Sequence, residues 1–181
     1  CAVLLFLPFV IYDRGYFLFF GDFNVQQVPF YRLAHEAVRT GDIYWNWYTD
    51  LGVNFQGSYS FYLLFSPFFW LTLPFPTSVV PYFMAPLLAL KMGVMSLTAY
   101  AFISRFTENK NAALLGGLLY AFSGFSVYNI FFNHFHDAMA FFPLLLLSMD
   151  ELVLEGKRGF FAFCVALCLM VNYFFFAGEV V

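Results

Sequence analysis

Long apolar runs separated by short polar turns fill most of the chain. The runs cover residues 82–105, 111–132, 138–154 and 160–181, and each carries few charged side chains. A helix needs about 20 mostly apolar residues to cross a bilayer. The pattern therefore predicts an all-α, polytopic transmembrane helical bundle in which these four segments are membrane helices.

The amino-terminal third follows a different pattern. Residues 1–12 are apolar but too short to cross a bilayer. We interpret them as the outer end of a first transmembrane helix, because neither the basic region nor the cleavage site of a signal peptide is visible. Residues 13–62 are more polar and predict a long first extracytoplasmic loop. Within it, residues 29–40 show helical periodicity with one apolar face, as expected for an amphipathic helix on the membrane surface.

Residues 63–73 are apolar but interrupted by Pro67, which predicts a re-entrant or short transmembrane segment. The positive-inside rule places the basic turns at residues 105–110 and 157–158 in the cytoplasm. The turn at residues 133–137 and the first loop then face outward. A single crossing by residues 63–73 would invert every later helix, so the re-entrant form is favoured.

The composition supports a membrane location. Of the 181 residues, 62% are hydrophobic and 10% are charged, whereas a soluble domain has about 45–50% apolar and about 25% charged residues. The net charge of -3 argues against a nucleic-acid partner. The three cysteines lie in apolar runs, so we interpret them as packing residues. Because the chain begins inside an apolar run without Met, we expect it to be part of a longer protein.

Lys91 lies within an apolar run, about 15 Å below Pro81 at a rise of about 1.5 Å per residue. A Lys at that depth costs about 2.5–3.5 kcal/mol on insertion scales, so its ammonium should face a cavity or a partner. Three interpretations stay open: contact with a substrate, a structural ion pair with Glu179 or another acid, and extension toward the membrane interface. Glu179 lies near the outer end of the last run and is itself a candidate for substrate contact.

Asp22 lies in the first loop, within the sequence Phe-Phe-Gly-Asp-Phe-Asn. A carboxylate bordered by aromatic side chains at a membrane surface can serve as a general base. The alternatives are a solvated loop acid and a cap for the helical segment that follows.

His134-Phe-His136-Asp137 forms a polar cluster in the outer turn. Imidazole and carboxylate groups bind divalent metal ions, but two His at positions i and i+2 do not share a helix face. The same residues could contact a phosphate or another substrate group. Asp137 is also placed to cap the helix that begins at residue 138.

Aromatic and basic residues of the loop are further candidates. Trp45 and Trp47, flanked by Tyr44 and Tyr48, could stack on a sugar ring or form an interfacial aromatic belt. Arg14 could bind a lipid phosphate, as could the two other arginines of the loop, although exposed Arg is common in loops.

An ordered series of short motifs runs through the chain. It consists of Gly21-Asp22 with Gln26, Pro29-Phe30-Tyr31, Trp45-Asn46, residues 51–55, Ser66-Pro67-Phe68, Leu90-Lys91, residues 119–124, His136-Asp137, Pro143-Leu144 and Asn172-Tyr173. In this order and at this spacing, the chain resembles the N-terminal part of the YfhO family of bacterial membrane proteins. The resemblance covers essentially the whole chain and rests on the ordered set of motifs.

The resemblance implies a GT-C type glycosyltransferase fold in the bacterial plasma membrane, with the active site facing outward. The implied reaction is an inverting transfer of a sugar from a polyprenyl-phosphate carrier to a cell-surface polymer such as a teichoic acid. Acidic catalytic positions in the outer loops of such enzymes match Asp22 and Asp137. His136 departs from the apolar or Trp residue that is common in the family. The negative charge of the leaving lipid phosphate would be stabilised by Lys91, His134, His136 or an Arg of the loop.

Two questions stay open from the sequence. Several GT-C relatives use a divalent metal ion and several do not, so the cofactor is unassigned. A non-catalytic transporter, flippase or scaffold for lipid-linked sugars would use the same loop and the same Lys to bind without transfer. A transporter is expected to show inverted repeats with paired broken helices, whereas one broken segment, around Pro67, is visible.

Overall fold

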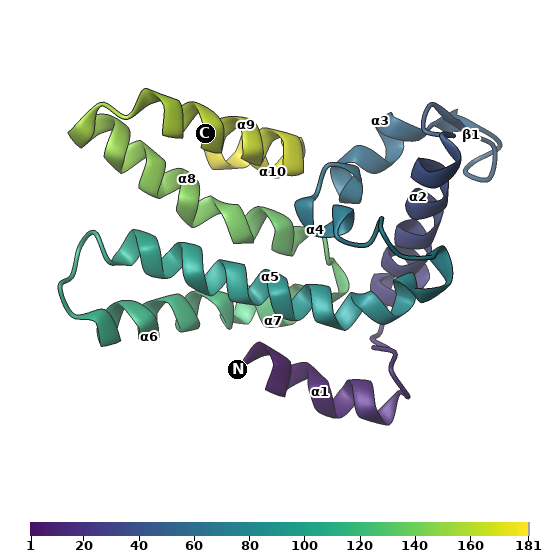
Figure 1. Cartoon of the computed structure of the whole chain (residues 1–181), viewed down its shortest axis with the longest axis horizontal. Coiled ribbons are helices and arrows are strands. Elements are labelled where there is room, and N and C mark those ends of the chain that lie inside the picture. Colours follow the sequence, from purple (N-terminus) through teal and green to yellow (C-terminus); the bar gives the residue numbers. More distant parts are fainter. Residues whose placement is uncertain (181) are drawn as a thin grey trace.

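The computed structural model describes residues 1–180, and the side chains of residues 1–178. It is mostly helical (Figure 1). The longer helices are α1 (Ala2–Tyr12), α2 (Val28–Thr40), α5 (Val80–Ile103), α6 (Lys110–Ala121), α8 (Phe135–Glu155), α9 (Arg158–Val171) and α10 (Tyr173–Val180). Short helical turns are η1 (Phe23–Gln27), α3 (Phe55–Tyr59), η2 (Ser60–Leu64), α4 (Pro67–Trp70), η3 (Thr77–Val79), α7 (Gly124–Tyr128) and η4 (Asn129–Phe131). The two-residue strands β1 (Trp45–Asn46) and β2 (Val53–Asn54) pair antiparallel, an exception to the predicted all-α class.

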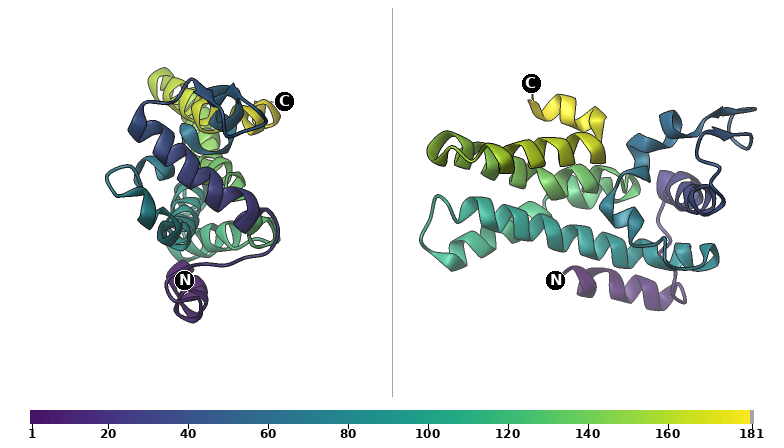
Figure 2. Two further views of the ribbon diagram at one scale, coloured as in Figure 1. Left: turned by 90° about the vertical axis from the view of Figure 1, so that its right-hand side faces the viewer. Right: turned by 45° about the horizontal axis from the view of Figure 1, so that its top comes forward.

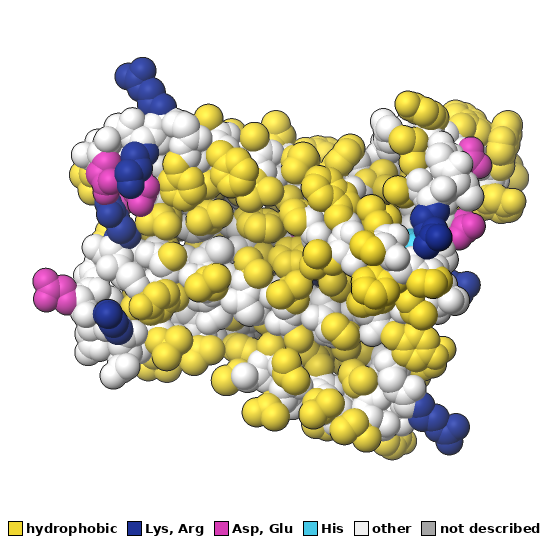
Figure 3. All heavy atoms as spheres, in the orientation of Figure 1, with side chains coloured by type: hydrophobic (Ala, Val, Ile, Leu, Met, Phe, Trp, Pro, Cys, Tyr) yellow, Lys and Arg dark blue, Asp and Glu magenta, His cyan; other side chains and the backbone are white. Residues whose placement is uncertain are grey.

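In the described part of the chain, two helical stretches are long and apolar enough to cross a membrane. They are Thr77–Ile103, which is η3 with α5, and Lys110–Phe131, which is α6 with α7 and η4. The helices α1 and α9 are apolar but shorter. Exposed apolar side chains cover much of the surface between the two ends of the bundle (Figure 3). Such a surface suits contact with lipid rather than with water.

The charged turns gather at one end of the bundle. Arg105, after α5, forms ion pairs with Asp150 and Glu155 of α8, at 3.0 and 2.7 Å. Lys157 also pairs with Glu155, at 2.9 Å. The two turns that the sequence places on one side of the membrane are thus in direct contact. Most of the polar loop of residues 13–62 lies at the opposite end (Figures 1 and 2).

Two glycines allow α6 to pack closely on α5. A Cβ atom on Gly117 would lie 2.5 Å from the backbone carbonyl oxygen of Ser96, and one on Gly116 would lie 2.7 Å from Ile103 Cδ1. Small residues at helix interfaces permit this kind of approach between membrane helices. A larger side chain at Gly117 would therefore push the two helices apart.

Helix α2 crosses the loop end of the bundle. Pro29 lies in its first turn, and Gly41 ends it with a left-handed φ of 83°, a conformation that carries no steric cost for glycine. His35 on the buried face has its Nδ1 2.9 Å from Thr77 Oγ1, at the start of η3. The amphipathic helix predicted for residues 29–40 is thus present and begins one residue earlier. A hydrogen bond joins it to the segment that leads into α5.

The turns η2 and α4 enter the bundle and return to the same end. Before η2, the hydroxyl of Tyr59 is hydrogen-bonded to that of Thr49 in the loop, at 2.7 Å. After α4, the carbonyl of Thr72 accepts a hydrogen bond from His35 of α2, at 3.1 Å. The chain reverses at Ser66, which is extended as expected for a residue before proline. The segment that the sequence describes as re-entrant or transmembrane is therefore folded back.

Two of the predicted spans are divided. The run 160–181 is interrupted at Asn172, whose backbone is extended. Its Oδ1 accepts from a backbone amide of α10 at 3.1 Å, and its Nδ2 donates to the carbonyl of Phe61 at 3.3 Å. The run 111–132 is interrupted at Ser123, which caps α7. A polar side chain that hydrogen-bonds to nearby backbone groups can end a helix. The apolar periodicity of the sequence does not show where such hydrogen bonds form.

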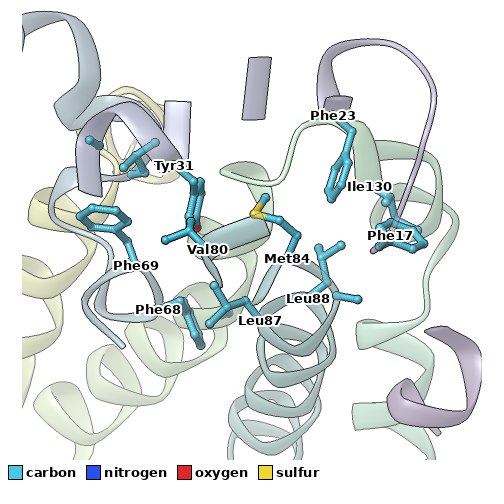
Figure 4. Packing of buried hydrophobic residues seen from close by; sticks show 14 of the residues in the cluster. Phe17, Phe23, Tyr31, Phe68, Phe69, Val80, Met84, Leu87, Leu88 and Ile130 are labelled. Atoms are coloured by element: carbon cyan, nitrogen blue, oxygen red, sulfur yellow. The ribbon is translucent and has the colours of Figure 1, made fainter. Parts of the chain in front are cut away.

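The core under α2 joins three parts of the chain (Figure 4). Tyr31 of α2 and Phe69 of α4 pack edge to face, with ring centroids 5.5 Å apart. Val80 and Met84 of α5 belong to the same buried cluster. This packing fixes α2, the folded-back segment and α5 relative to one another, at the end of the bundle where the candidate site lies.

Candidate functional site

Lys91 is paired inside the bundle. Its Nζ lies 3.0 Å from Asp137 Oδ2 of α8, and the two side chains are only 0% and 2% exposed. The ammonium also donates to the carbonyl oxygen and to the side-chain Oδ1 of Asn133, at 3.0 and 2.9 Å. All three of its N–H groups therefore have acceptors. The partner acid among the described residues is Asp137. The side chain of Glu179, the other predicted partner, lies outside the described residues.

Asp137 is engaged on both oxygens. Its Oδ1 accepts a hydrogen bond of 2.8 Å from Ser66 Oγ, at the point where the folded-back segment reverses. The pair therefore ties that segment to α5 and α8. The cap predicted for Asp137 is not formed, because α8 begins at Phe135 and the Asp137 side chain is buried within its first turn.

The two histidines of the outer turn are buried in different surroundings. His136 Nε2 donates to the carbonyl of Ser126 at 2.8 Å. His134 packs among aromatic rings, including that of Tyr62 at a centroid distance of 4.8 Å. Burial, and then the positive charge of Lys91, lowers the pKa of His134 to about 3. His134 is therefore neutral near pH 7.

A metal-ligand set does not form from the His-Phe-His-Asp motif. Within the described part of the chain, no three side chains of His, Cys, Asp or Glu come together. Asp137 points to Lys91 and Ser66, while the Nε2 of His136 points to a backbone carbonyl. The geometry thus gives the motif packing and hydrogen-bonding roles in this structure.

Asp22 lies near the same Tyr62 that contacts His134. It precedes η1, is half-buried and makes no side-chain cap. Burial, and then the negative charge of Asp22, raises the pKa of the Tyr62 hydroxyl. Among the residues that the structure describes, no hydrogen bond or ion pair engages the Asp22 carboxylate. The loop end thus holds the unengaged carboxylate of Asp22, the phenol of Tyr62 and the neutral imidazole of His134.

A polar groove lies between α2, the segment after α1 and the start of α5. Its volume is about 890 Å³, and its polar lining includes Arg32, Asn24 and Ser78. No hydrogen bond or ion pair with another described residue engages the Arg32 guanidinium. Arg14 is exposed and does not line the groove. Glu36, also in the lining, accepts a hydrogen bond from Thr77 at 2.8 Å.

A second groove, of about 560 Å³, lies between α1 and α5. Its lining is apolar apart from a glycine: Val3, Phe6, Leu7, Val10, Ala85, Pro86, Ala89, Leu90 and Gly93. The rings of Tyr16 and Tyr82 are stacked, with their centroids 4.3 Å apart. Tyr16 lines the polar groove, and Tyr82 lines a small hollow together with Pro86. Residues that line the polar groove, the small hollow and the apolar groove therefore follow one another along the loop end of α5.

Trp45 and Trp47 lie on the hairpin formed by β1 and β2. Their rings meet edge to face at 5.7 Å. The structure thus brings these two predicted substrate contacts together, and it places them at the tip of the loop.

The chain can now be compared with known protein families. A family model described as "Bacterial membrane protein YfhO" matches residues 1–176. The chain belongs to the YfhO family. No curated protein and no solved structure gives a significant match. Membership places the chain in a family of bacterial membrane proteins, in agreement with its two helical stretches able to span a membrane.

In this YfhO-family chain, several polar residues near the ion pair were not assigned a role at the site from the sequence. Ser66 and Asn133 complete the hydrogen bonds of Asp137 and Lys91. Tyr31 Oη and Asn133 Nδ2 are both buried, and the Tyr31 hydroxyl interacts with the Asn133 side chain. Burial, and then the charge of Asp137, raises the pKa of Tyr31, so its hydroxyl lies near the pair. The available signal was a polar residue at the edge of an apolar run: Ser66 stands alone there, and Asn133 begins the polar turn of residues 133–137.

Proposed function

We propose that this YfhO-family chain carries the catalytic loop of a polytopic membrane glycosyltransferase of GT-C type. The enzyme transfers a sugar from a polyprenyl-phosphate carrier to a cell-surface polymer at the outer face of the plasma membrane. Family membership supports the membrane setting. The observation that carries the proposal is the half-buried, unengaged carboxylate of Asp22 in the first loop, whose charge acts on the Tyr62 hydroxyl.

A general base needs a carboxylate that is free to accept a proton. Asp137 has both oxygens occupied, by Lys91 and Ser66, and is buried. Asp22 is half-buried at the loop end and unengaged. Proton abstraction is therefore assigned to Asp22, and such catalysis contributes roughly 10²–10⁴-fold to the rate. Asp137 acts as a positioning residue that holds the turn carrying His134.

The transfer then proceeds as a direct displacement. Asp22 takes the proton of an acceptor hydroxyl as that oxygen attacks the anomeric carbon. The bond between the anomeric carbon and the carrier phosphate oxygen breaks, and its electron pair leaves with the phosphate. Attack from the opposite face inverts the anomeric centre. His134 is neutral, so it assists as a hydrogen-bonding group and not as a fixed charge.

Arg32 is the cation best suited to the carrier phosphate. Its guanidinium lies unengaged in the polar groove, whereas the ammonium of Lys91 is fully committed. Arg binds phosphate through two parallel hydrogen bonds. The apolar groove between α1 and α5 suits the isoprenoid tail, because its lining contains only apolar side chains and glycine. Tyr16 of the polar groove stacks on Tyr82 at the start of α5.

The test is sugar transfer by the full-length protein in membranes supplied with a radiolabelled polyprenyl-phosphate sugar. Asp22→Asn is expected to lower the label entering polymer by at least about 100-fold, at equal expression and with binding of the lipid-linked sugar retained. Asp13→Asn is the matched control in the same loop. Asp13 Oδ2 accepts from the amide of Leu18 at 3.1 Å, a bond that an Asn oxygen keeps. Unchanged transfer by Asp22→Asn would instead favour a transporter, flippase or scaffold for lipid-linked sugars.

A further inference from the structure

A buried histidine of α2 is hydrogen-bonded through both of its ring nitrogens. The His35 side chain is 0% exposed. Its Nε2 lies 3.1 Å from the carbonyl oxygen of Thr72, and its Nδ1 lies 2.9 Å from the hydroxyl oxygen of Thr77. The same hydroxyl lies 2.8 Å from Oε2 of Glu36. A chain of three hydrogen bonds thus runs from a backbone carbonyl, through the imidazole and the hydroxyl, to a carboxylate. We call these four residues the His35 network.

The hydrogen atoms of the His35 network can be counted. A carbonyl oxygen only accepts, so Nε2 of His35 carries a proton. An ionised carboxylate also only accepts, so the single hydroxyl hydrogen of Thr77 is donated to Glu36. The Thr77 oxygen then accepts from His35, and Nδ1 must carry a proton as well. With both ring nitrogens as donors, His35 is an imidazolium cation.

A second placement of the hydrogens also completes the three bonds. A protonated Glu36 would donate to Thr77, and Thr77 would donate to Nδ1 of a neutral His35. This placement holds the same number of protons, which is one more than a neutral imidazole and an ionised carboxylate hold together. The Glu36 side chain is exposed, and water stabilises the ionised form of a carboxyl group. The additional proton therefore belongs on His35.

The charge of this buried imidazolium is balanced by Glu36. Helix α2 packs against η1, η3 and α5, and neither η1, η3 nor the connection of residues 71–76 contains an ionisable residue. The ionisable residues of α2 and α5 are Tyr31, Arg32, Glu36, Arg39, Tyr82, Lys91 and Tyr100. Lys91 is already paired with Asp137, and Arg39 donates to the carbonyl of Phe75 at 2.7 Å. Glu36 is the acid in this set, and Thr77 connects it to His35.

The His35 network also forms part of the wall of the polar groove. Arg32, Glu36 and Thr77 all line this groove. While the proton is held, the bonds of His35 join α2 to the segment that leads into α5, and the cation compensates the Glu36 carboxylate. When the proton leaves, the Thr77 hydrogen can serve either His35 or Glu36, so one bond is lost. The negative charge of Glu36 then faces the groove without compensation.

We propose that His35 is a positioning residue whose proton holds α2 against the segment before α5, so that the polar groove binds a phosphate anion more tightly as the pH falls. The proton on His35 follows from the hydrogen bonds alone. The phosphate rests on the proposed function, in which Arg32 of this groove meets the carrier phosphate. Like charges brought together are repelled, so an uncompensated Glu36 opposes that phosphate.

The first experiment is nitrogen NMR of the full-length protein in nanodiscs, with isotope-labelled histidine. The ring signals of His35 are identified by their absence in His35→Gln. They are expected to show two protonated nitrogens at pH 6 and a neutral ring at higher pH. Glu36→Gln keeps an oxygen that accepts from Thr77 but removes the balancing charge, so the signals should change at a lower pH. A neutral ring at pH 6, or an unchanged transition in Glu36→Gln, would overturn the proposal.

Asp42→Asn is the matched control for the loss of one negative charge. Asp42 is an exposed acid just beyond the end of α2 and is not a member of the His35 network. The variant is expected to leave the His35 transition where it is. A change as large as that in Glu36→Gln would overturn the specific role of Glu36.

The second experiment measures binding of a polyprenyl-phosphate sugar to the same nanodiscs without acceptor. The phosphodiester keeps its single negative charge from pH 6 to pH 8.5, so a change in affinity reports on the protein. Kd is expected to rise at least about 5-fold over this range, and to stay nearly constant in Glu36→Gln. An equal pH dependence in the two proteins would overturn the link between the proton and the groove.

These outcomes can be separated from that of the proposed function. The His35 signals are measured without any substrate. A doubly protonated His35 in a protein whose transfer does not need Asp22 would overturn the transferase proposal alone. A neutral His35 at pH 6, in a protein whose transfer does need Asp22, would overturn the present proposal alone.

Discussion

Lys91 Nζ lies 3.0 Å from Asp137 Oδ2, in a part of the bundle where neither side chain reaches solvent. Ser66 holds the second oxygen of the same carboxylate. The two charged residues thus connect two helices, and a third segment is joined to them through one hydroxyl. A buried ion pair of this kind stabilises little relative to apolar replacements, but loss of one partner leaves an uncompensated charge.

We therefore expect Asp137→Leu alone to destabilise the full-length protein by about 3–5 kcal/mol, and the double variant Lys91→Met/Asp137→Leu to recover most of that loss. Thermal unfolding in detergent measures both. Transfer activity of the stable double variant separates a positioning role from a catalytic one. A loss of about 100-fold or more would restore Asp137 as a catalytic acid or base, and a loss of a few fold would fit positioning.

The contact between α5 and α6 gives a prediction about packing. Gly117→Ala places a methyl group where the backbone oxygen of Ser96 is 2.5 Å away, so we expect a loss of about 1–3 kcal/mol from forced separation of the helices. Gly93→Ala is the control, because nothing lies within 4 Å of its added Cβ. It should be neutral or stabilising by up to about 1 kcal/mol. Equal unfolding temperatures for the two variants would contradict the close approach.

The sequence pattern predicted elements whose ends are marked by local chemistry. Pro29 and Gly41 delimit α2 to within one residue, because each restricts the backbone at its own position. The breaks at Ser123 and Asn172 were missed, since their cause is a hydrogen bond from the side chain to nearby or distant backbone. Apolar periodicity carries no information about such bonds.

The sequence predicted individual residues of the candidate site, but it did not predict which of these residues contact one another. Because burying a Lys in a membrane helix is costly, Lys91 was expected to face a cavity or a partner. Its position along the helix gave its depth in the membrane. The choice of Asp137 as partner depends on how α8 packs against α5, which is a contact across 46 residues. The nearness of Asp22 to Tyr62 likewise follows from the folding back of η2, which the sequence presents only as an apolar run with a proline.

His134 gives a prediction about pH. Its pKa is lowered to about 3 in the folded protein, by burial first, against an ordinary value of about 6.5. Between these values the unfolded chain binds a proton that the folded chain does not, so the free energy of unfolding falls as the pH is lowered. From pH 7 to pH 5 we expect a loss of about 2 kcal/mol from this group. His134→Phe keeps the ring packing and should remove this part of the pH dependence of the free energy of unfolding, measured by denaturant titrations at several pH values. An unchanged pH dependence would contradict the assignment.

Arg32 gives the last prediction, which concerns the donor. If its guanidinium binds the carrier phosphate in the polar groove, Arg32→Gln removes a charged hydrogen bond of about 1.5–3 kcal/mol. KM for the polyprenyl-phosphate sugar should then rise about 10- to 100-fold, while kcat changes much less because the base is untouched. Arg158→Gln, in the charged turn at the opposite end of the bundle, is the matched control and should leave KM unchanged. A fall in kcat without a change in KM would instead assign Arg32 to the transition state, where it would stabilise the charge that develops on the leaving phosphate.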